Sequence, residues 1–468
     1  MRLLPGIALC GLMSTSAFAQ ASFTILTSGG AEAVSPDGRF VVGRTSGGSA
    51  YLWDRTTGLT TLTGSGTDGA VDLSADGQTI FGASGTSPAQ PAIWNGTSWT
   101  DLGEVSPGSG GCPEFGTAYA LSDDGTAGTG LGWIGCSAVA FRWTASGGLT
   151  ALPVSGPGSA RGNAISGNGN IVGGWDEAPN GQRRAALWRS NGQQGLLLVN
   201  TPGNQIGAGE VWGLSTNGEI AVGHGSDSAF LWTQATGPQD LGKPAGTSFP
   251  TTAMGVSDDG SIVVGTAGSP FSGGPDAFIW TQATGAILLG DYVTNVLGLT
   301  LPAGMVLRAA TDISTDGRTI VGSAWPGGPN PFASQAFVLD LPEPCGWETY
   351  GVGLGGANVL DVTGGGSDGL GGIFQVTTTG ITGPVSVTAV GFAASSFPAL
   401  GGTGLIDVFQ FYGYFVNGAT AGTSTMNVAL PTNPTLAGLE VFFQTFAPDA
   451  SQIEGWALSN GLKLEVCP

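Results

Sequence analysis

A short pattern recurs seven times along this chain and limits the folds that the chain can adopt. Each copy has a hydrophobic residue followed by serine, any residue, aspartate or asparagine, and glycine. Successive serines are 39, 48, 44, 49, 42 and 57 residues apart, which is the period of a β-propeller blade and too long for a leucine-rich solenoid. The repeats are numbered 1 to 7 by their serines: Ser35, Ser74, Ser122, Ser166, Ser215, Ser257 and Ser314.

Each repeat predicts four short strands joined by turns, which together describe one antiparallel blade. An apolar segment precedes the serine. The Asp-Gly or Asn-Gly pair then predicts a type I′ hairpin turn, because both residues tolerate positive φ. A β-rich stretch ending in glycine follows, then a variable loop and an apolar run that ends in Trp. The regular spacing of these Trp residues indicates packing between blades: Trp53, Trp94, Trp143, Trp188, Trp232 and Trp280, with Leu339 in repeat 7.

The two ends of the repeat region predict how a ring closes. Repeat 7 lacks a fourth strand, and residues 23–26 have the composition of that strand. We therefore expect residues 23–26 to pair with residues 336–339, which would close an all-β, seven-bladed β-propeller and hide two sheet edges. An open β-solenoid of the same repeats is the second possibility. An eight-bladed ring, with a degenerate blade before Ser314, is the third.

Repeats 5 and 6 resemble the HAF-repeat family of exported bacterial proteins, which is named for a His-Ala-Phe run before Leu-Trp. The match is carried by Ala-Phe-Leu-Trp-Thr at 229–233, Asp-Leu-Gly at 240–242 and Ala-Phe-Ile-Trp-Thr at 277–281. Ser228 and Asp276 stand in place of the histidine, so no role of that histidine is transferred. The resemblance covers residues 22–341 and implies an extracellular, propeller-like protein.

The composition fits a loop-rich globular protein with a second β domain. There are 85 Gly and 27 Pro, but 41% of residues are hydrophobic and 13 are Trp, which argues against disorder. After residue 341 the repeats stop, and alternating runs such as 385–390 and 439–444 predict a C-terminal β-sandwich. The expected domains are a signal peptide at 1–19, the propeller at 20–341 and the sandwich at 342–468.

Residues 1–19 have the features of a secretory signal peptide. Arg2 precedes a short apolar run, and Ala17-Phe18-Ala19 forms a small-x-small cleavage site. The run is too short to anchor the chain in a membrane, and its continuation past Cys10 disfavours a lipoprotein signal. We therefore expect a secreted protein, extracellular or at the cell surface, with no transmembrane segment after signal removal.

Four cysteines remain after signal removal, namely Cys112, Cys136, Cys345 and Cys467. Four cysteines allow three pairings, and disulfides are expected in an exported chain. The local pairing is favoured because Cys112 and Cys136 share one repeat, whereas Cys345 and Cys467 bracket the C-terminal segment. A zinc site is disfavoured because the chain has one histidine and no CxxC spacing.

Charge and motifs exclude several classes of function. A net charge of −20, with 13 basic against 33 acidic residues, argues against binding to nucleic acid or to anionic membranes. His224 is the only histidine and stands at a variable position, and no Gly-x-Ser-x-Gly motif occurs, so we assign no catalytic residue. The GxGxxG match at 351–356 precedes a predicted strand instead of a helix, so we assign no cofactor.

Two features are candidate binding sites. Asp123-Asp124 and Asp258-Asp259 have the chemistry of Ca²⁺ ligands. The second aspartate of each pair is also the turn residue, which asparagine replaces in repeats 4 and 5, so the turn explains these pairs better. Tryptophans outside the regular pattern are candidates for ligand stacking: Trp99, Trp133, Trp175, Trp212 and Trp325. We expect recognition in the variable loops 84–91, 128–139 and 266–276.

Our primary hypothesis is an exported, non-enzymatic binding or structural protein with a propeller surface that takes an extracellular glycan or protein. The alternative is a carbohydrate-active enzyme, a hydrolase or lyase, that uses carboxylates in the central funnel. An enzyme would gather several Asp or Glu at one end of the funnel. A scaffold would line the funnel with small apolar residues.

Overall fold

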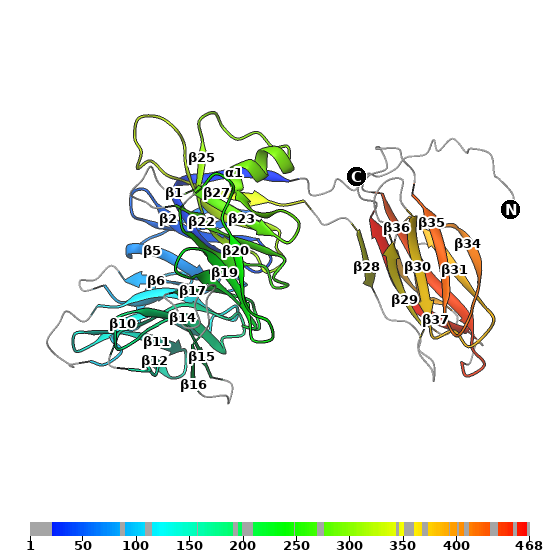
Figure 1. Ribbon diagram of the computed structural model, residues 1–468, viewed down its shortest axis with the longest axis horizontal. Coiled ribbons are helices and arrows are strands. Elements are labelled where there is room, and N and C mark those ends of the chain that lie inside the picture. Colours follow the sequence, from blue (N-terminus) through cyan, green and yellow to red (C-terminus); the bar gives the residue numbers. More distant parts are fainter. Residues whose placement is uncertain are drawn as a thin grey trace. The chain divides into compact units, whose positions relative to one another are not determined.

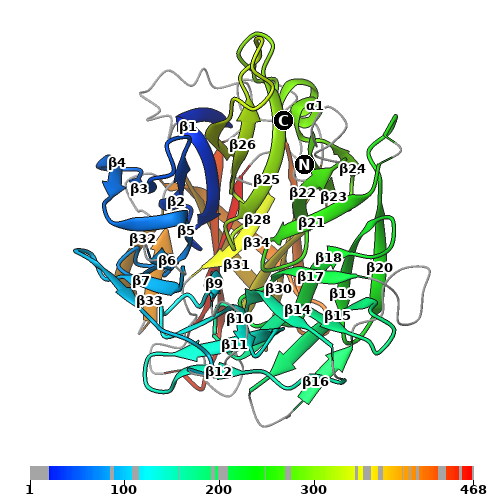
Figure 2. The ribbon, with the colours of Figure 1, turned by 90° about the vertical axis from the view of Figure 1, so that its left-hand side faces the viewer.

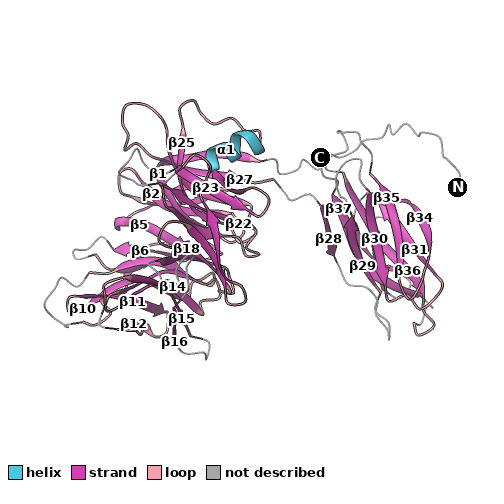
Figure 3. Ribbon diagram, viewed as in Figure 1, coloured by secondary structure: helices cyan, strands magenta, loops and turns pink. Residues whose placement is uncertain are grey.

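The computed structural model is all-β apart from one short helical segment (Figure 3). The chain divides into two compact units, Ala19–Pro342 and Glu343–Pro468. The predicted signal peptide and the GxGxxG match lie outside the described residues. The structure describes residues 21–84, 89–107, 115–156, 158–190, 195–198, 209–247, 249–268, 276–342, 346–350, 360–366, 373–392, 394–399, 402–406, 411–430, 439–452 and 456–465.

Repeats 2 to 6 each form one antiparallel sheet of four strands in chain order (Figure 1). Repeat 2 has β5 (Ser65–Leu73), β6 (Ile80–Ser84), β7 (Pro91–Trp94) and β8 (Trp99–Asp101). Repeat 3 has β9 (Thr117–Leu121), β10 (Ala127–Ile134), β11 (Ser137–Thr144) and β12 (Gly148–Ala151). Repeat 4 has β13 (Ala160–Ile165), β14 (Ile171–Glu177), β15 (Arg183–Arg189) and β16 (Gly195–Leu198). Repeat 5 has β17 (Glu210–Leu214), β18 (Ile220–His224), β19 (Ala229–Thr233) and β20 (Gly237–Gly242). Repeat 6 has β21 (Thr251–Val256), β22 (Ile262–Ala267), β23 (Asp276–Thr281) and β24 (Gly285–Leu288).

Repeats 1 and 7 share one open sheet of seven strands, in the order β25-β26-β27-β1-β2-β3-β4. The long strand β1 joins them, since its first half pairs with β27 and its second half with β2. Phe23 lies opposite Leu339 and Ile25 opposite Phe337, so the predicted pairing of residues 23–26 with 336–339 is confirmed. The strands are β1 (Ser22–Val34), β2 (Phe40–Thr45), β3 (Ala50–Asp54), β4 (Gly58–Leu62), β25 (Val306–Ile313), β26 (Thr319–Trp325) and β27 (Gln335–Asp340).

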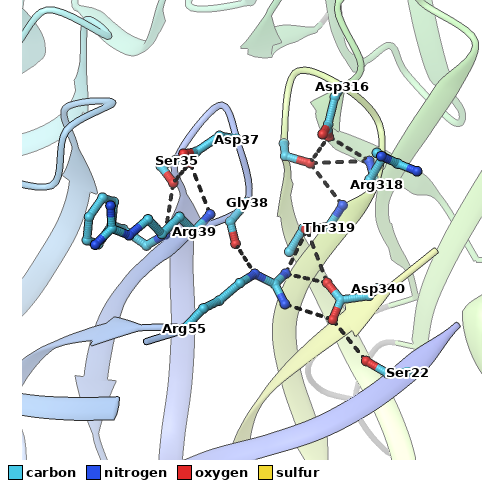
Figure 4. Close-up of polar contacts among 12 residues, drawn as sticks. Ser22, Ser35, Asp37, Gly38, Arg39, Arg55, Asp316, Arg318, Thr319 and Asp340 are labelled. Atoms are coloured by element: carbon cyan, nitrogen blue, oxygen red, sulfur yellow. Dashed lines mark hydrogen bonds and ion pairs between the residues drawn. The ribbon is translucent and has the colours of Figure 1, made fainter. Parts of the chain in front are cut away.

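An ion pair reinforces this junction (Figure 4). Arg55 of repeat 1 pairs with both carboxylate oxygens of Asp340, at the end of β27, and its Nε donates to Gly38 O at 2.7 Å. Asp340 also accepts hydrogen bonds from the hydroxyl groups of Ser22, at 2.9 Å, and Thr319, at 3.2 Å. Repeats that lie at opposite ends of the sequence are therefore joined by polar side chains as well as by strand pairing.

Seven apolar clusters hold the sheets together, and each cluster joins two repeats. Repeat 7 contributes Val321 and Val338 to the cluster that it shares with Tyr51 of repeat 1, and the other six clusters join consecutive repeats. The Trp residues of the repeat pattern lie in these clusters or against them, which confirms their predicted packing role. Figure 2 shows the first strands of the sheets toward the middle of this unit and the fourth strands outward.

The repeated serine organises its turn through its hydroxyl group. In repeat 1, Ser35 Oγ donates to Asp37 Oδ1 at 2.7 Å and accepts the N–H of Phe40 at 2.9 Å. The other six repeats make both hydrogen bonds. The predicted type I′ turn is wrong, because the turn glycine has positive φ but the preceding Asp or Asn does not. The Asp or Asn side chain fixes a different turn by accepting the N–H two residues on.

A β-bulge at one position recurs in the first strand of every repeat. The residue three positions before the serine has no partner on the second strand, as Glu32 shows between Ala31 and Ala33. The bulge brings a first-strand carbonyl oxygen, on the residue five positions before the serine, close to the glycine eight positions after the serine. A Cβ atom at that glycine would lie closer to this oxygen than van der Waals contact allows. These seven glycines are Gly43, Gly82, Gly130, Gly174, Gly223, Gly265 and Gly322.

The 57-residue interval before Ser314 holds α1 (Leu289–Asp291) and η1 (Tyr292–Val296), whose Leu289 and Val293 pack into the cluster of repeats 6 and 7. Its described residues contain no additional sheet, which disfavours an eighth blade. Among the described residues, none of the helical segments is long and apolar enough to cross a membrane.

The described residues of the C-terminal unit form three antiparallel sheets, of five, three and two strands. The five-stranded sheet (β28-β37-β36-β31-β34) and the three-stranded sheet (β29-β30-β35) share one apolar core, where the Phe374 and Phe443 rings lie 6.2 Å apart. The strands are β28 (Gly346–Tyr350), β29 (Asp361–Gly366), β30 (Ile373–Thr379), β31 (Val385–Gly391), β32 (Ala394–Ala399), β33 (Gly402–Ile406), β34 (Phe411–Gly418), β35 (Ser424–Ala429), β36 (Glu440–Pro448) and β37 (Trp456–Glu465).

The glycine that faces the bulge has a testable energetic role. In Gly265→Ala the new methyl group meets the carbonyl oxygen of Thr252, so we expect a loss of at least about 2 kcal/mol in the free energy of unfolding. Gly290→Ala is the control, because nothing lies within 4 Å of that position. Chemical denaturation measures both variants. Equal stabilities of the two variants would contradict the proposed close approach.

Candidate functional site

A cavity of about 410 Å³ is lined by the first strands of all seven repeats. Equivalent positions of the repeats form successive layers of its wall. The residue before each serine forms an apolar layer: Val34, Leu73, Leu121, Ile165, Leu214, Val256 and Ile313. The bulged residues form a second layer of the same wall, and no two of them are alike: Glu32, Val71, Tyr119, Asn163, Trp212, Met254 and Thr311.

The bulge explains why seven unlike residues share one wall. Re-aiming a side chain is a common role of β-bulges, and here the unpaired residue of each first strand lines the cavity. The flanking positions are restricted by packing, because the residue four positions before each serine is small or is Val211. The bulged position carries no such restriction, so repeats that fold alike differ where they face the cavity.

Two residues before the serine, the cavity wall has Ala or Gly in five repeats and Asp in the other two. Asp312 accepts the N–H groups of Val34 and Ile313 at 2.9 and 2.8 Å, and Asp72 does the same for Leu121 and Leu73 at 2.6 and 2.8 Å. Burial raises the pKa of Asp312 to about 7, although both N–H groups oppose the rise. Burial also raises the pKa of Asp72 well above its usual range. Each carboxyl group therefore joins its repeat to the next one.

The residue after each serine links neighbouring turns, and in repeats 1, 3, 4, 5 and 7 it also lines the cavity. Asp123 N–H donates to Gly167 O and Asp258 N–H to Thr315 O, both at 2.9 Å. The other links are Ala75 N to Asp123 O, Asn168 N to Thr216 O, Thr216 N to Asp258 Oδ1, and Thr315 Oγ1 to Pro36 O. These hydrogen bonds connect the turns of repeats 2 through 7 and then repeat 1. Pro36 has no N–H with which to continue the series to repeat 2.

The acidic pairs are explained by these turns. Asp124 and Asp259 accept the serine hydroxyls of their own turns, as the sequence analysis favoured. Asp258 accepts the N–H of Thr216 at 2.7 Å, whereas the Asp123 carboxylate has no hydrogen-bond partner among the described residues. Burial and the charges of Asp258 and Asp124 raise the pKa of Asp123. No group of three Asp, Glu, His or Cys among the described residues is arranged to hold a metal ion.

Arg161 lies beside the cavity between two of the bulged aromatic residues. Its guanidinium carbon is 5.1 Å from the ring centroids of both Tyr119 and Trp212. Its Nη2 donates to Glu210 at 2.8 Å, and Glu210 also accepts Arg183 Nη1 at 2.6 Å. The stacked guanidinium therefore holds the two rings in position, and its charge is opposed by a nearly buried carboxylate.

Glu32 lies on another part of the wall, in repeat 1. Its side chain is exposed to the cavity and has no hydrogen-bond partner among the described residues. Its pKa is raised because the cavity keeps it from bulk water, while the charge of Arg44 opposes the rise. Arg44 also lines the cavity.

Of the five candidate tryptophans, Trp212 alone lines this cavity. Trp175 is 4% exposed and lies 4.3 Å from the Arg183 guanidinium carbon, and Trp325 Nε1 donates to Asn330 O. The other two pack against aromatic neighbours, Trp99 against Trp94 and Trp133 against Phe115.

The remaining predicted positions have mixed outcomes. Residues 128–139 are not a loop but mostly the paired strands β10 and β11. Loops 84–91 and 266–276 are only partly described. Burial lowers the pKa of His224, and its Nδ1 has no partner among the described residues. Cys136 is disulfide-bonded, whereas Cys112, Cys345 and Cys467 lie outside the described residues, so the pairing stays a prediction.

The repeat pattern does not predict which residues line the cavity, because the seven bulged residues share no residue type. One signal was present: the variable position three residues before each invariant serine. Reading that one column across the repeats lists the seven bulged residues.

Comparisons with known proteins give distant structural likenesses. No family model and no curated protein match the sequence. TolB from Acinetobacter baumannii is 12% identical over 70% of this chain and 64% of its own length, with a TM-score of 0.36. A putative TolB from Agrobacterium tumefaciens is 13% identical over 69% of this chain and 99% of its own, with a TM-score of 0.35. Likenesses at these scores carry no argument about fold or function.

The raised pKa of Asp312 predicts how stability depends on pH. An unfolded aspartate has a pKa of about 4. With a folded pKa of about 7, the native state binds more protons between these values, so stability falls as pH rises from 4 to 7. Relative to Asp312→Asn, the wild type should lose about 2 kcal/mol of unfolding free energy across this window, which is half the unscreened value because the cavity admits water.

Urea unfolding at pH 4, 5, 6 and 7 measures this difference. Asp227→Asn is the control, because that side chain is 69% exposed. A wild-type to Asp312→Asn difference that stays constant over the range would contradict the assignment.

Proposed function

We propose that this chain is an exported, non-enzymatic binding protein whose repeats form a seven-bladed β-propeller with a ligand site in its axial cavity. The C-terminal unit, which we infer to be a β-sandwich, serves as a second adhesion or assembly module. The observation that carries the proposal is the bulged position. All seven repeats aim it at one cavity, and each supplies a different side chain.

Three sets of contacts support a closed ring of seven blades. Strand β1 pairs with β27, so repeats 7 and 1 are neighbours. The apolar clusters number seven, which is the number of interfaces that a closed ring of seven requires. The hydrogen bonds between turns run from repeat 2 through repeat 7 and on to repeat 1. In an open stack of the same repeats, repeat 7 and repeat 1 would lie at opposite ends and would not contact each other.

Ring closure predicts that the N-terminal strand contributes to global stability. Phe23 stacks on Phe337 with 5.5 Å between ring centroids. If the ring is closed, Phe23→Ala should lower the free energy of unfolding by about 2 kcal/mol while the transition stays cooperative. Phe332→Ala, at a side chain that is 91% exposed, should change it by less than about 0.5 kcal/mol. If β1 frayed independently, both variants would unfold like the wild type.

A volume of about 410 Å³ falls in the range of small-ligand pockets, which supports binding inside the ring. The serine, the turn glycine and the second-strand glycine recur in all seven repeats, where the serine hydroxyl organises the turn and the second-strand glycine leaves room for a carbonyl group. The bulged residues follow no common residue type, although Asn163 and Thr311 also hydrogen-bond to a neighbouring repeat and Val71 packs against an apolar cluster. Their diversity is what a site for an asymmetric ligand needs, since a ring with equivalent walls would favour no orientation.

The alternative, a carbohydrate-active enzyme, is favoured by one observation. Asp72, Asp123 and Asp312 line the same cavity, and all three have raised pKa values. A carboxyl group with a raised pKa is a candidate general acid. However, Asp72 and Asp312 each accept two backbone N–H groups, which gives them a structural role.

A screen of the mature chain tests the proposed function. The panel contains amino acids, dipeptides, nucleosides, monosaccharides and oligosaccharides, with binding followed by thermal shift and calorimetry and products by chromatography. Val71→Phe narrows the cavity at a bulged position, and Val154→Phe is a control at an exposed site. We expect a ligand that binds the wild type and Val154→Phe but binds Val71→Phe at least tenfold more weakly. Equal binding to Val71→Phe, or no binding at all, contradicts the cavity site, and product release supports the enzyme.

A further inference from the structure

The charges of the cavity wall argue against an anionic ligand. Four carboxyl groups line the cavity, namely Glu32, Asp72, Asp123 and Asp312, and Arg44 is the lining cation among the described residues. Arg44 faces Glu32, and the neighbouring Arg161 pairs with Glu210. A bound phosphate or carboxylate would add to a field that already raises the pKa of Asp123.

The carboxylates of the cavity wall are not arranged as the ligands of a metal ion. Glu32 and Asp123 have carboxylates without hydrogen-bond partners among the described residues, but no three acidic groups there are close enough to hold a cation. Carboxylates arranged singly on a wall are strong acceptors for hydroxyl donors. The lining therefore calls for a ligand with several hydroxyl groups.

Tyr119 and Trp212 favour a ligand that also has an apolar face. Both rings line the cavity, and Arg161 stacks between them. Trp212 is half-buried, and its indole N–H is buried without a partner among the described residues, so the accessible part of this side chain is apolar ring carbon. With Met254 on the next repeat, these side chains offer a broad apolar surface to one face of a ligand.

We propose that the cavity binds a neutral sugar residue, an inference that rests on the proposed function and names its ligand class. A pyranose ring combines the two properties that the wall requires, an apolar face of C–H groups and a rim of hydroxyls. Trp212 and Tyr119 pack against that face, and Glu32 and Asp123 accept hydrogen bonds from the hydroxyls. A uronic acid has the same ring but adds a negative charge among carboxylates.

Calorimetry with matched sugars tests this inference. The probes are glucose, galactose, mannose and xylose, followed by the 6-carboxylate of the best binder: glucuronic, galacturonic or mannuronic acid for a hexose. If xylose binds best, glucuronic acid is the acidic probe. We expect a neutral sugar to bind and its acidic counterpart to bind at least tenfold more weakly.

Variants assign the contacts. Trp212→Ala should weaken binding at least tenfold, and Trp212→Phe, which keeps an aromatic face, should stay within about threefold of the wild type. Trp325→Ala is the matched control outside the cavity, and circular dichroism checks that each variant is folded. Glu32→Gln should weaken binding about fivefold, and Glu219→Gln, at an exposed turn, should not.

The outcomes separate this inference from the proposed function. If amino acids or nucleosides bind in a Val71-dependent way and no neutral sugar does, the sugar inference is wrong and the binding function stands. Equal affinity for the uronic acid, or full affinity in Trp212→Ala, also overturns it. If nothing binds in the cavity, both proposals fail.

Discussion

The close approach of two backbones in each repeat is the constraint on which the rest of this structure depends. A carbonyl group of the first strand sits where the Cβ of the facing second-strand residue would be, so that residue is glycine in all seven repeats. The contact exists because the first strand is bulged, and the bulge leaves one residue unpaired. The geometry that requires glycine at one position thus leaves another position that differs from repeat to repeat. The cavity wall is the sum of those seven free positions.

The serine turns supply the second part of the framework. Each serine hydroxyl organises its own hairpin, and the residue after it bonds to the neighbouring turn. Apolar clusters fill the space between sheets and include the repeated tryptophans. The proposed ligand site therefore rests on a framework whose parts are repeated, whereas the residues of the site are not.

Much of the framework was predictable from sequence because it is repeated. Strand order within repeats, the packing of the Trp series and the pairing of Phe23 with residues near Leu339 all follow from recurrence and alternation. The turn type was not, because only Gly38 of the Asp-Gly pair has positive φ and the Asp37 side chain shapes the hairpin by accepting a backbone N–H. The site was found only in part: Trp212 stood out as an irregular tryptophan, but Glu32, Asp72 and Asp312 look like ordinary variation until the strands are assembled. A bulge changes which side of the strand each residue faces. Its position depends on the register with the neighbouring strand, and that register cannot be read from the sequence.

Fluorine NMR of the protein labelled with 5-fluorotryptophan tests the cavity site most directly, with the Trp212 resonance assigned through Trp212→Phe. The chain has 13 tryptophans, and Trp212 is the one on the cavity wall among the described residues. On titration with a bound sugar, the Trp212 signal should shift in proportion to occupancy while the Trp325 signal stays in place. A ligand that binds without moving the Trp212 signal would contradict the claim that the bulged positions form the binding site.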